Sequence, residues 1–340
     1  MDHVAIDLGG RESQICVRSE DGGILEEDRR ATRSLGRYLA TRPRSRVVME
    51  TCAEAFEVAE RAREAGHEVV VVPAMLVRSL GVGHRGIKTD VRDARNLSEA
   101  SCRMERLPGV HIPSKEARER KAMCSIREAL IQVRTKLINA VRGWTRSQGL
   151  GTVRSGAPTT FPARVRELAK THGKVIPKYL ERALASLDQL TGEIGDADVE
   201  LEEVAKSDPT CKLLMTAPGV GPVTAVRFVA TVDGVDRFPD AHRVQSYIGL
   251  TPGEDSSSDR KRRTGLTKAG AVKVRWAFIQ AAWAARRYYK DDPAVQWAME
   301  VEKRRGKRVA VAALARKLVG ILYAMWRDNR PYDRQYGVRL

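Results

Sequence analysis

Short apolar runs alternate with helical patterns over the first hundred residues of the chain. The apolar runs fall at residues 4–8, 47–49 and 69–72, and a further β-rich run at residues 14–18 can pair with the first as a hairpin across Gly9-Gly10. Helical patterns occupy residues 34–40, 54–65 and 90–104. This interleaving predicts a mixed α/β sheet with helices on its faces. The glycine-rich, basic stretch at residues 81–88 is expected to be a loop.

From residue 114 the pattern changes to long, charged helices, after a linker marked by Pro108 and Pro113. Ser114 is a suitable N-cap for the first helix, which is predicted to end near residue 147. Its apolar positions recur every three or four residues: Met123, Ile126, Leu130, Val133, Leu137, Ile138 and Val141. A second long helix is predicted for residues 177–206. The two helices form either an intramolecular hairpin or a dimerising arm.

A third, mostly helical part is predicted from residue 208 onward. In it a helix ends, a turn reads Pro-Gly-Val-Gly, and a new helix starts at Pro222, where proline suits the first turn. This is the pattern of a helix-hairpin-helix, whose glycines let backbone N–H groups approach a phosphate. Gly219 and Gly221 are therefore candidate nucleic-acid contacts, and an ordinary tight turn between helices is the alternative. The domains are predicted as residues 1–107, 108–207 and 208–340.

The core of this third part is predicted to come from apolar helices at residues 272–285 and 309–326. Its tryptophans share these helical apolar stripes, which favours a place in the core over a base-stacking platform. The four assigned in this way are Trp276, Trp283, Trp297 and Trp326.

Charge and cysteine usage narrow the class of protein. The formal net charge is +17, which predicts a polyanionic partner. The five cysteines are scattered and never form a C-x-x-C pair, which favours a reducing compartment and argues against a zinc site or a disulfide framework. No signal-peptide pattern or membrane-spanning apolar run is apparent. We expect a cytoplasmic protein that faces nucleic acid and no membrane.

Four carboxylates are the candidate metal ligands. Asp7 and Glu50 each follow an apolar strand run, and Asp90 and Asp93 lie three residues apart, on one face of a helix. An ionised group beside an apolar core needs a compensating partner, and hard carboxylate oxygens suit Mg²⁺, with Mn²⁺ as an alternative. Such a site could perform two-metal phosphoryl chemistry. A surface or capping role is the alternative for any one of them, and for Asp93 an ion pair with neighbouring arginines.

A serine-rich and basic stretch follows Pro252. Ser256, Ser257 and Ser258 precede a run of cations, and a further lysine follows: Arg260, Lys261, Arg262, Arg263 and Lys268. Taken alone, such a stretch is usually a solvated loop. The functional interpretation is a serine nucleophile that attacks a phosphodiester, with the cations stabilising charge on the phosphate oxygens.

These motifs resemble those of a known family. The segments I-D-L-G, M-E-T and K-T-D-V-R-D-A, around Asp7, Glu50 and Asp90, resemble the DEDD motifs of a RuvC-like domain with the RNase H fold. The later A-P-G-V-G and G-L-T-P segments, at residues 217–221 and 249–252, resemble the second domain of the DEDD insertion-sequence transposases. These are the bridge-RNA-guided serine recombinases of bacterial mobile elements, and the resemblance covers nearly the whole chain.

The resemblance implies a RuvC-like first domain, a coiled-coil-like helical arm and a mostly helical last domain. It also implies a homo-oligomer, dimer or tetramer, in which a structured non-coding RNA pairs with donor and target DNA in the bacterial nucleoid. Strand exchange would proceed through a serine–phosphate link, with Asp7, Glu50, Asp90 and Asp93 as the acidic set. The nucleophile would be Ser257, five residues after Pro252; Ser258 follows it where the family usually has glycine, and Ser256 remains an alternative.

Two other classes of function fit the residues. One is a RuvC-like, metal-dependent nuclease that uses no serine. The other is a non-catalytic nucleic-acid-binding protein. A covalent phosphoserine adduct would separate both from a recombinase.

Overall fold

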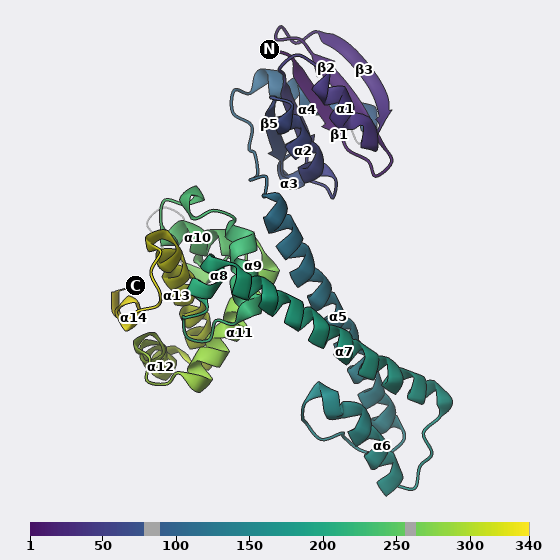
Figure 1. The fold of residues 1–340 in the computed structure, drawn as a ribbon, viewed down its shortest axis with the longest axis vertical. Helices are drawn as coiled ribbons and strands as arrows, with labels where there is room; N and C mark the ends of the chain where they lie inside the picture. Colours follow the sequence, from purple (N-terminus) through teal and green to yellow (C-terminus); the bar gives the residue numbers. More distant parts are fainter. Residues whose placement is uncertain (78–88, 256–262, 340) are drawn as a thin grey trace. The chain divides into compact units, whose positions relative to one another are not determined.

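The computed structural model describes residues 1–77, 89–255 and 263–339. The chain divides into two compact units, Met1–Pro113, here called the sheet unit, and Ser114–Leu340, here called the helical unit (Figure 1). From Ser114 onward, the arm expected at residues 108–207 belongs to the helical unit.

The sheet unit is built on one five-stranded mixed sheet, as predicted. Its strands are β1 (His3–Asp7), β2 (Glu12–Arg18), β3 (Ile24–Ala31), β4 (Arg46–Glu50) and β5 (Glu68–Val72), in the spatial order β3-β2-β1-β4-β5. β1, β2 and β3 form an antiparallel meander, which confirms the hairpin across Gly9-Gly10. β4 lies parallel to β1, and β5 lies parallel to β4.

Helices cover both faces of this sheet. They are α1 (Leu35–Ala40), after the short η1 (Thr32–Ser34), α2 (Ala55–Glu64), α3 (Ala74–Val77) and α4 (Asp90–Arg103). Because strand side chains alternate between faces, Val4 and Ile6 pack with α1 and α2, whereas Ala5 packs with α4. Burial on both sides explains the continuous apolar runs of β1 and β4. β3 has no apolar run that would predict it, because this edge strand is mostly charged.

Two long helices open the helical unit and run antiparallel to each other. α5 (Lys115–Ser147) is capped by Ser114, whose Oγ accepts from the N–H of Ala117 at 3.1 Å, as predicted. α7 (Lys178–Ser207) packs along it, and ion pairs Arg120–Asp208 and Arg127–Asp198 tie the two together. The intramolecular hairpin of the two alternatives is therefore present.

The hairpin has a separate small core at its tip. Here η3 (Pro158–Thr160) and α6 (Phe161–Thr171) close over the ends of α5 and α7, and Phe161, Val165, Leu184 and Val141 are buried together. No helix was predicted for residues 161–171, because they follow a Gly-, Pro- and Thr-rich stretch that masks the pattern.

The base of the hairpin joins the main helical core. The remaining elements are α8 (Pro209–Leu214), α9 (Pro222–Val232), η4 (Val235–Arg237), α10 (Ala241–Ile248), β6 (Pro252–Glu254), β7 (Arg263–Leu266), α11 (Val272–Tyr288), α12 (Pro293–Arg305), α13 (Lys307–Asp328) and α14 (Arg334–Arg339). Among the described residues, only α13 is long and apolar enough to span a membrane, and 72% of its apolar window is buried inside the unit, as in a core helix.

The prediction that all four tryptophans belong to this core is wrong for two of them. Trp326 packs edge-on against Phe228, and Trp283 is half buried against the core. Trp276 and Trp297, by contrast, are 53% and 41% exposed. The reason is geometric for Trp276: the residues of α11 that face the core, such as Val274 and Phe278, lie on the opposite side of the helix.

Candidate functional site

Two of the predicted carboxylates lie at neighbouring strand ends. In the parallel register of β1 and β4, Ile6 is paired with Met49. Asp7 and Glu50 are the next residues along each strand, and both are half buried. The carboxyl ends of adjacent parallel strands thus present two acids at one edge of the sheet.

Helix α4 brings the other two acids toward the same end. Its later residues lie against the starts of the strands: Ser101 is hydrogen-bonded to His3 at 2.8 Å, and Arg46 donates to the carbonyl of Met104 at 2.9 Å. α4 therefore runs opposite to β1 and β4. Its first turn, with Asp90 and Asp93, lies toward the end of the sheet at which Asp7 and Glu50 are found.

The donor chemistry of these four carboxylates fits a hard divalent cation. Their oxygens are the ligands that Mg²⁺ and Mn²⁺ prefer, and no soft sulfur ligand lies among them. Within the parts of the chain that the structure describes, no group of three or more His, Cys, Asp or Glu side chains is close enough to hold an ion. The fold thus brings the acids to one end of the unit without drawing them into one coordination sphere.

The second candidate site is a hairpin loop in the helical unit. Ser256, Ser257 and Ser258, together with three of the predicted cations, lie outside the described residues: Arg260, Lys261 and Arg262. The strands on either side are described: β6 and β7 are antiparallel, with Pro252 paired with Leu266. Thr267 extends the ladder by donating its N–H to the carbonyl of Thr251 at 2.9 Å. The return strand β7 begins at Arg263, and Lys268 follows it, exposed.

Two glycines fix the base of this hairpin. Gly249 and Gly270 have φ angles of 77° and 80°. A Cβ on Gly249 would overlap the carbonyl oxygen of Ala269, and one on Gly270 would overlap that of Tyr247. Arg275 adds a clamp, because its Nη1 donates to the carbonyl of Ile248 at 2.9 Å. The hairpin is thereby attached to the end of α10 and the start of α11. Sequence reasoning missed Arg275, for which no motif gave a signal.

The Pro-Gly-Val-Gly turn has the predicted local structure, since α8 ends at Leu214 and α9 begins at Pro222 with Gly221 as its N-cap. The two glycines differ in surroundings. Gly219 has φ 76°, and a Cβ there would be 2.6 Å from the backbone nitrogen of Ala285, so this glycine is needed for packing on α11. Gly221 has open space where a Cβ would be. A phosphate contact is thus better supported at Gly221 than at Gly219.

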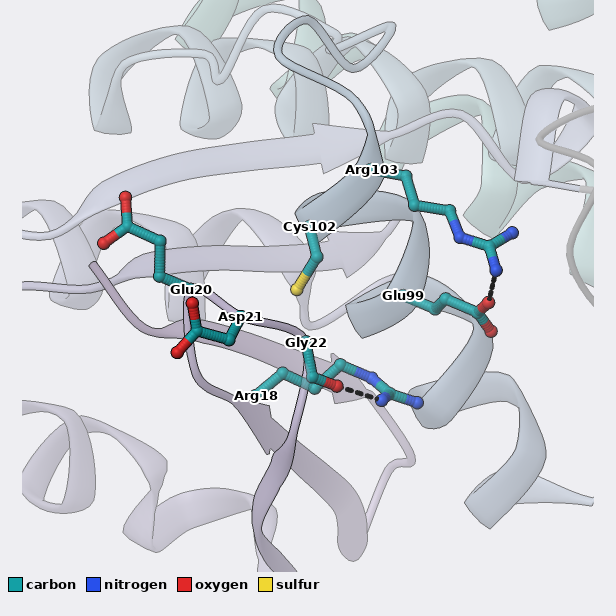
Figure 2. A pocket seen from close by; sticks show the side chains of 7 residues that line it. All are labelled: Arg18, Glu20, Asp21, Gly22, Glu99, Cys102 and Arg103. Carbon is teal, nitrogen blue, oxygen red and sulfur yellow. Dashed lines mark hydrogen bonds and ion pairs between the residues drawn. The ribbon is translucent and has the colours of Figure 1, made fainter.

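A cavity of about 410 Å³ in the sheet unit lies away from the acids (Figure 2). It is lined by Arg18, Glu20, Asp21, Gly22, Glu99, Cys102 and Arg103. Arg103 is paired with Glu99, and Arg18 donates to the carbonyl of Gly22 at 2.7 Å (Figure 2). Burial raises the pKa of the Cys102 thiol, which weakens it as a nucleophile. The cavity adjoins the last turn of α4, at the far end from Asp90.

Models of known protein families match segments of both units. A family model for DEDD transposases of the IS110 type, described as "Transposase", matches residues 4–145. A second, "Transposase IS116/IS110/IS902 family", matches residues 211–296. The transposase for insertion sequence element IS1111A of Coxiella burnetii is 28% identical over 337 residues, covering 97% of this chain and 90% of that protein. The transposase for IS1328 of Yersinia enterocolitica is 27% identical, covering 97% and 98%.

A mixed sheet with acids at adjacent strand ends, followed by a helical unit matched by a transposase model, defines an insertion-sequence transposase with a DEDD-type, RuvC-like first domain. The chain belongs to the IS110/IS116/IS902 family of transposases. Membership implies that it binds DNA and cleaves and rejoins it, and the DEDD domain indicates dependence on a divalent metal ion.

Proposed function

We propose that this transposase exchanges DNA strands by combining the acidic end of the sheet unit with a serine nucleophile on the β6–β7 hairpin. The observation that carries the proposal is the register of β1 and β4, which sets Asp7 beside Glu50 at the end of the sheet toward which α4 begins. Either unit alone lacks half of this chemistry. We therefore expect the isolated units to be inactive.

Asp7, Glu50, Asp90 and Asp93 would hold the divalent ion, Mg²⁺ or Mn²⁺. When bound, the ion neutralises charge on the scissile phosphate and lowers the pKa of a coordinated water. Asp90 and Asp93 would be contributed by the first turn of α4, and Asp7 and Glu50 by the strand ends.

Ser257 is the proposed nucleophile, with Ser256 as the alternative. Its Oγ forms a bond to phosphorus, the bond from phosphorus to one deoxyribose oxygen breaks, and the serine proton passes to a carboxylate or water at the acidic site. In rejoining, a DNA hydroxyl attacks the phosphoserine and Oγ regains a proton. The cations of the hairpin would balance the charge on the phosphate oxygens: Arg260, Lys261, Arg262, Arg263 and Lys268.

The turn before α9 is proposed to hold the DNA backbone near the hairpin. Gly221 caps α9 without a side chain, so the N–H of Val223 is open to a phosphate oxygen, whereas Pro222 has no N–H and that of Thr224 donates to the Gly221 carbonyl at 3.1 Å. Gly219 supports this contact by fitting the turn against α11. Such a grip is independent of DNA sequence.

We propose that a structured non-coding guide RNA determines which DNA sequences are recognised, by pairing with donor and target DNA. The net charge of +17 suits a protein that binds two polyanions.

We also propose a homo-oligomer, a dimer or tetramer, formed through the outer side of α5. Ile126 and Val133 are 64% and 50% exposed there, at the heptad-like spacing expected of a coiled-coil seam.

The decisive experiment traps the covalent intermediate on a suicide DNA substrate, with guide RNA supplied. We expect a protein–DNA adduct in wild type and in Ser256→Ala, and none in Ser257→Ala, in Asp7→Asn or after chelation of divalent ions. Asp7→Asn should still bind DNA. Full recombination by Ser257→Ala would remove this serine from the mechanism. Metal-dependent nicking without any adduct would establish the nuclease, and binding without strand breakage would establish a non-catalytic protein.

A further inference from the structure

Helix α11 presents an aromatic line on its outer side. Val272, the first residue of the helix, is exposed, and so is Trp276, one turn later. Trp283, two turns later on the same side, is half buried. The line thus starts next to the β6–β7 hairpin, because only residues 267–271 separate β7 from α11. Exposing the indole of Trp276 to water is unfavourable, and its exposed part adds nothing to the packing of the core.

The corner where α12 meets α13 carries five cations within six residues. They are Lys303, Arg304, Arg305, Lys307 and Arg308, all exposed, and they are here called the basic corner. Lys303 is paired with Glu300 at 2.6 Å. In the described parts of the chain the other four have no ion pair with a carboxylate, so their charge is available to a ligand.

The aromatic line and the basic corner are continuous. The Nζ of Lys307 lies 5.2 Å from the ring centroid of Trp283, over its face. α11 and α13 pack against each other in the main helical core, which brings the start of α13 beside Trp283 (Figure 1). A surface therefore extends from the start of α11 past Trp276 and Trp283 to the cations of the corner.

Stability alone does not explain the charges of the corner. The positive end of a helix dipole favours carboxylates in the first turn, whereas α13 starts with Lys307 and Arg308 and has no acidic residue there. Its N-cap, Gly306, supplies no side-chain hydrogen bond. The cations therefore destabilise the helix start, and a bound anion would reverse that effect.

We propose that this surface binds a single-stranded segment of DNA, with an unpaired base stacked on Trp276 and the phosphates on the basic corner. Single-stranded DNA is favoured over a duplex because an indole face gains stacking energy only from a base that is free of its own stack. The inference rests on the proposed function for the source of the strand, which is the DNA opened at the serine hairpin. It does not rest on the identity of the nucleophile.

Fluorescence anisotropy of the full chain with a labelled 20-nucleotide DNA tests the stacking. The protein carries Ser257→Ala and the buffer contains EDTA, so that cleavage plays no part. We expect Trp276→Ala to weaken single-strand binding about tenfold and to leave binding of the matching duplex unchanged. Trp276→Phe should retain binding and Trp276→Leu should lose it, because leucine keeps the apolar surface but cannot stack.

The salt dependence of the same binding tests the basic corner. Changing Arg304, Arg305, Lys307 and Arg308 to Gln should lower the slope of log K against log [NaCl] by about 3, since each single-strand phosphate contact contributes about 0.7. The matched control removes four exposed cations near the tip of the helical hairpin formed by α5 and α7. They are Lys170, Lys174, Lys178 and Arg182. An equal decrease in slope for both variants would show only a general charge effect and would overturn the site.

Three further outcomes would overturn the proposal. One is equal binding by Trp276→Leu and Trp276→Phe. Another is a Trp276→Ala effect that appears only with RNA of the same sequence. The third is a change in the molar mass of Trp276→Ala by light scattering, which would assign this surface to contact between copies of the chain. None of these results bears on the covalent adduct, so failure here and failure of the proposed function are distinguishable.

Discussion

Gly249 and Ala269 lie in direct backbone contact, with no room for a side chain between them. Gly249 ends α10 in the left-handed conformation, and Ala269 follows the β6–β7 hairpin. The position of strands β6 and β7 relative to α11 thus depends on a residue without a Cβ.

We expect Gly249→Ala to destabilise the base of the hairpin. The substitution adds strain at positive φ, of about 1–3 kcal/mol, and a clash with the Ala269 carbonyl oxygen. Thermal unfolding should occur at lower temperature, and cleavage should fall more than DNA binding. Gly265→Ala in β7 is the control, because no atom lies within 4 Å of the added Cβ. Equal unfolding temperatures for the two variants would contradict the proposed contact.

The buried Arg227 should be the most costly arginine to remove. It is only 6% exposed and donates to Glu128 at 2.9 Å and to the carbonyl of Cys124 at 2.9 Å, which ties α9 to α5. Arg227→Ala leaves Glu128 with only the more distant Lys273, at 3.9 Å, and we expect a loss of about 3 kcal/mol in urea denaturation. The more exposed Arg286–Glu302 pair is the comparison: Arg286→Ala should cost about 1 kcal/mol or less. A reversed order would mean that burial does not set these energies.

Tyr38 should make the stability of the sheet unit depend on alkaline pH. Burial is the main cause that raises the pKa of its phenol from 10 to about 12. Between these values the unfolded chain loses the proton before the folded chain does, so the free energy of unfolding falls as pH rises. Denaturation midpoints of wild type and Tyr38→Phe, measured at pH 9 and pH 11, should converge as pH rises. Parallel pH profiles would show that this phenol makes no contribution.

The outer side of α5 should control oligomeric state. Ile126→Asp with Val133→Asp places charge on two exposed apolar positions, so the fold should survive while association is lost. Light scattering should report a lower molar mass than for wild type. Val175→Asp, at a position that is 90% exposed near the tip, is the control and should not change the mass. An unchanged mass in the double variant would exclude this side of α5 as the interface.

Most elements of the sheet unit could be predicted from sequence because its central strands are buried on both faces. These strands therefore have continuous apolar runs, and Asp7 and Glu50 follow the runs at the strand ends. The edge strand β3 gave no such signal. The pairing of β1 with β4 could not be predicted either, because register depends on contacts between segments some forty residues apart.

In the helical unit, periodicity located the helices better than the sides that they bury. The apolar residues of α11 were all assigned to the core, although Trp276 shares a side of the helix with Lys273 and Gln280 and faces solvent. In the same way, the glycines of the turn before α9 predicted a close approach, but not that Gly219 approaches α11. Both errors concern a tertiary neighbour, and local sequence carries no record of it.

The burial of α13 has a consequence for synthesis on the ribosome. The helices that it packs against, from α8 to α12, all emerge earlier, yet their shared interior stays open until residues 310–325 have been translated. A copy of the gene interrupted before that point would yield a protein whose sheet unit can fold while its other half exposes apolar surface to proteases. The truncated proteins made from such interrupted genes would then be degraded before they could compete with the intact transposase.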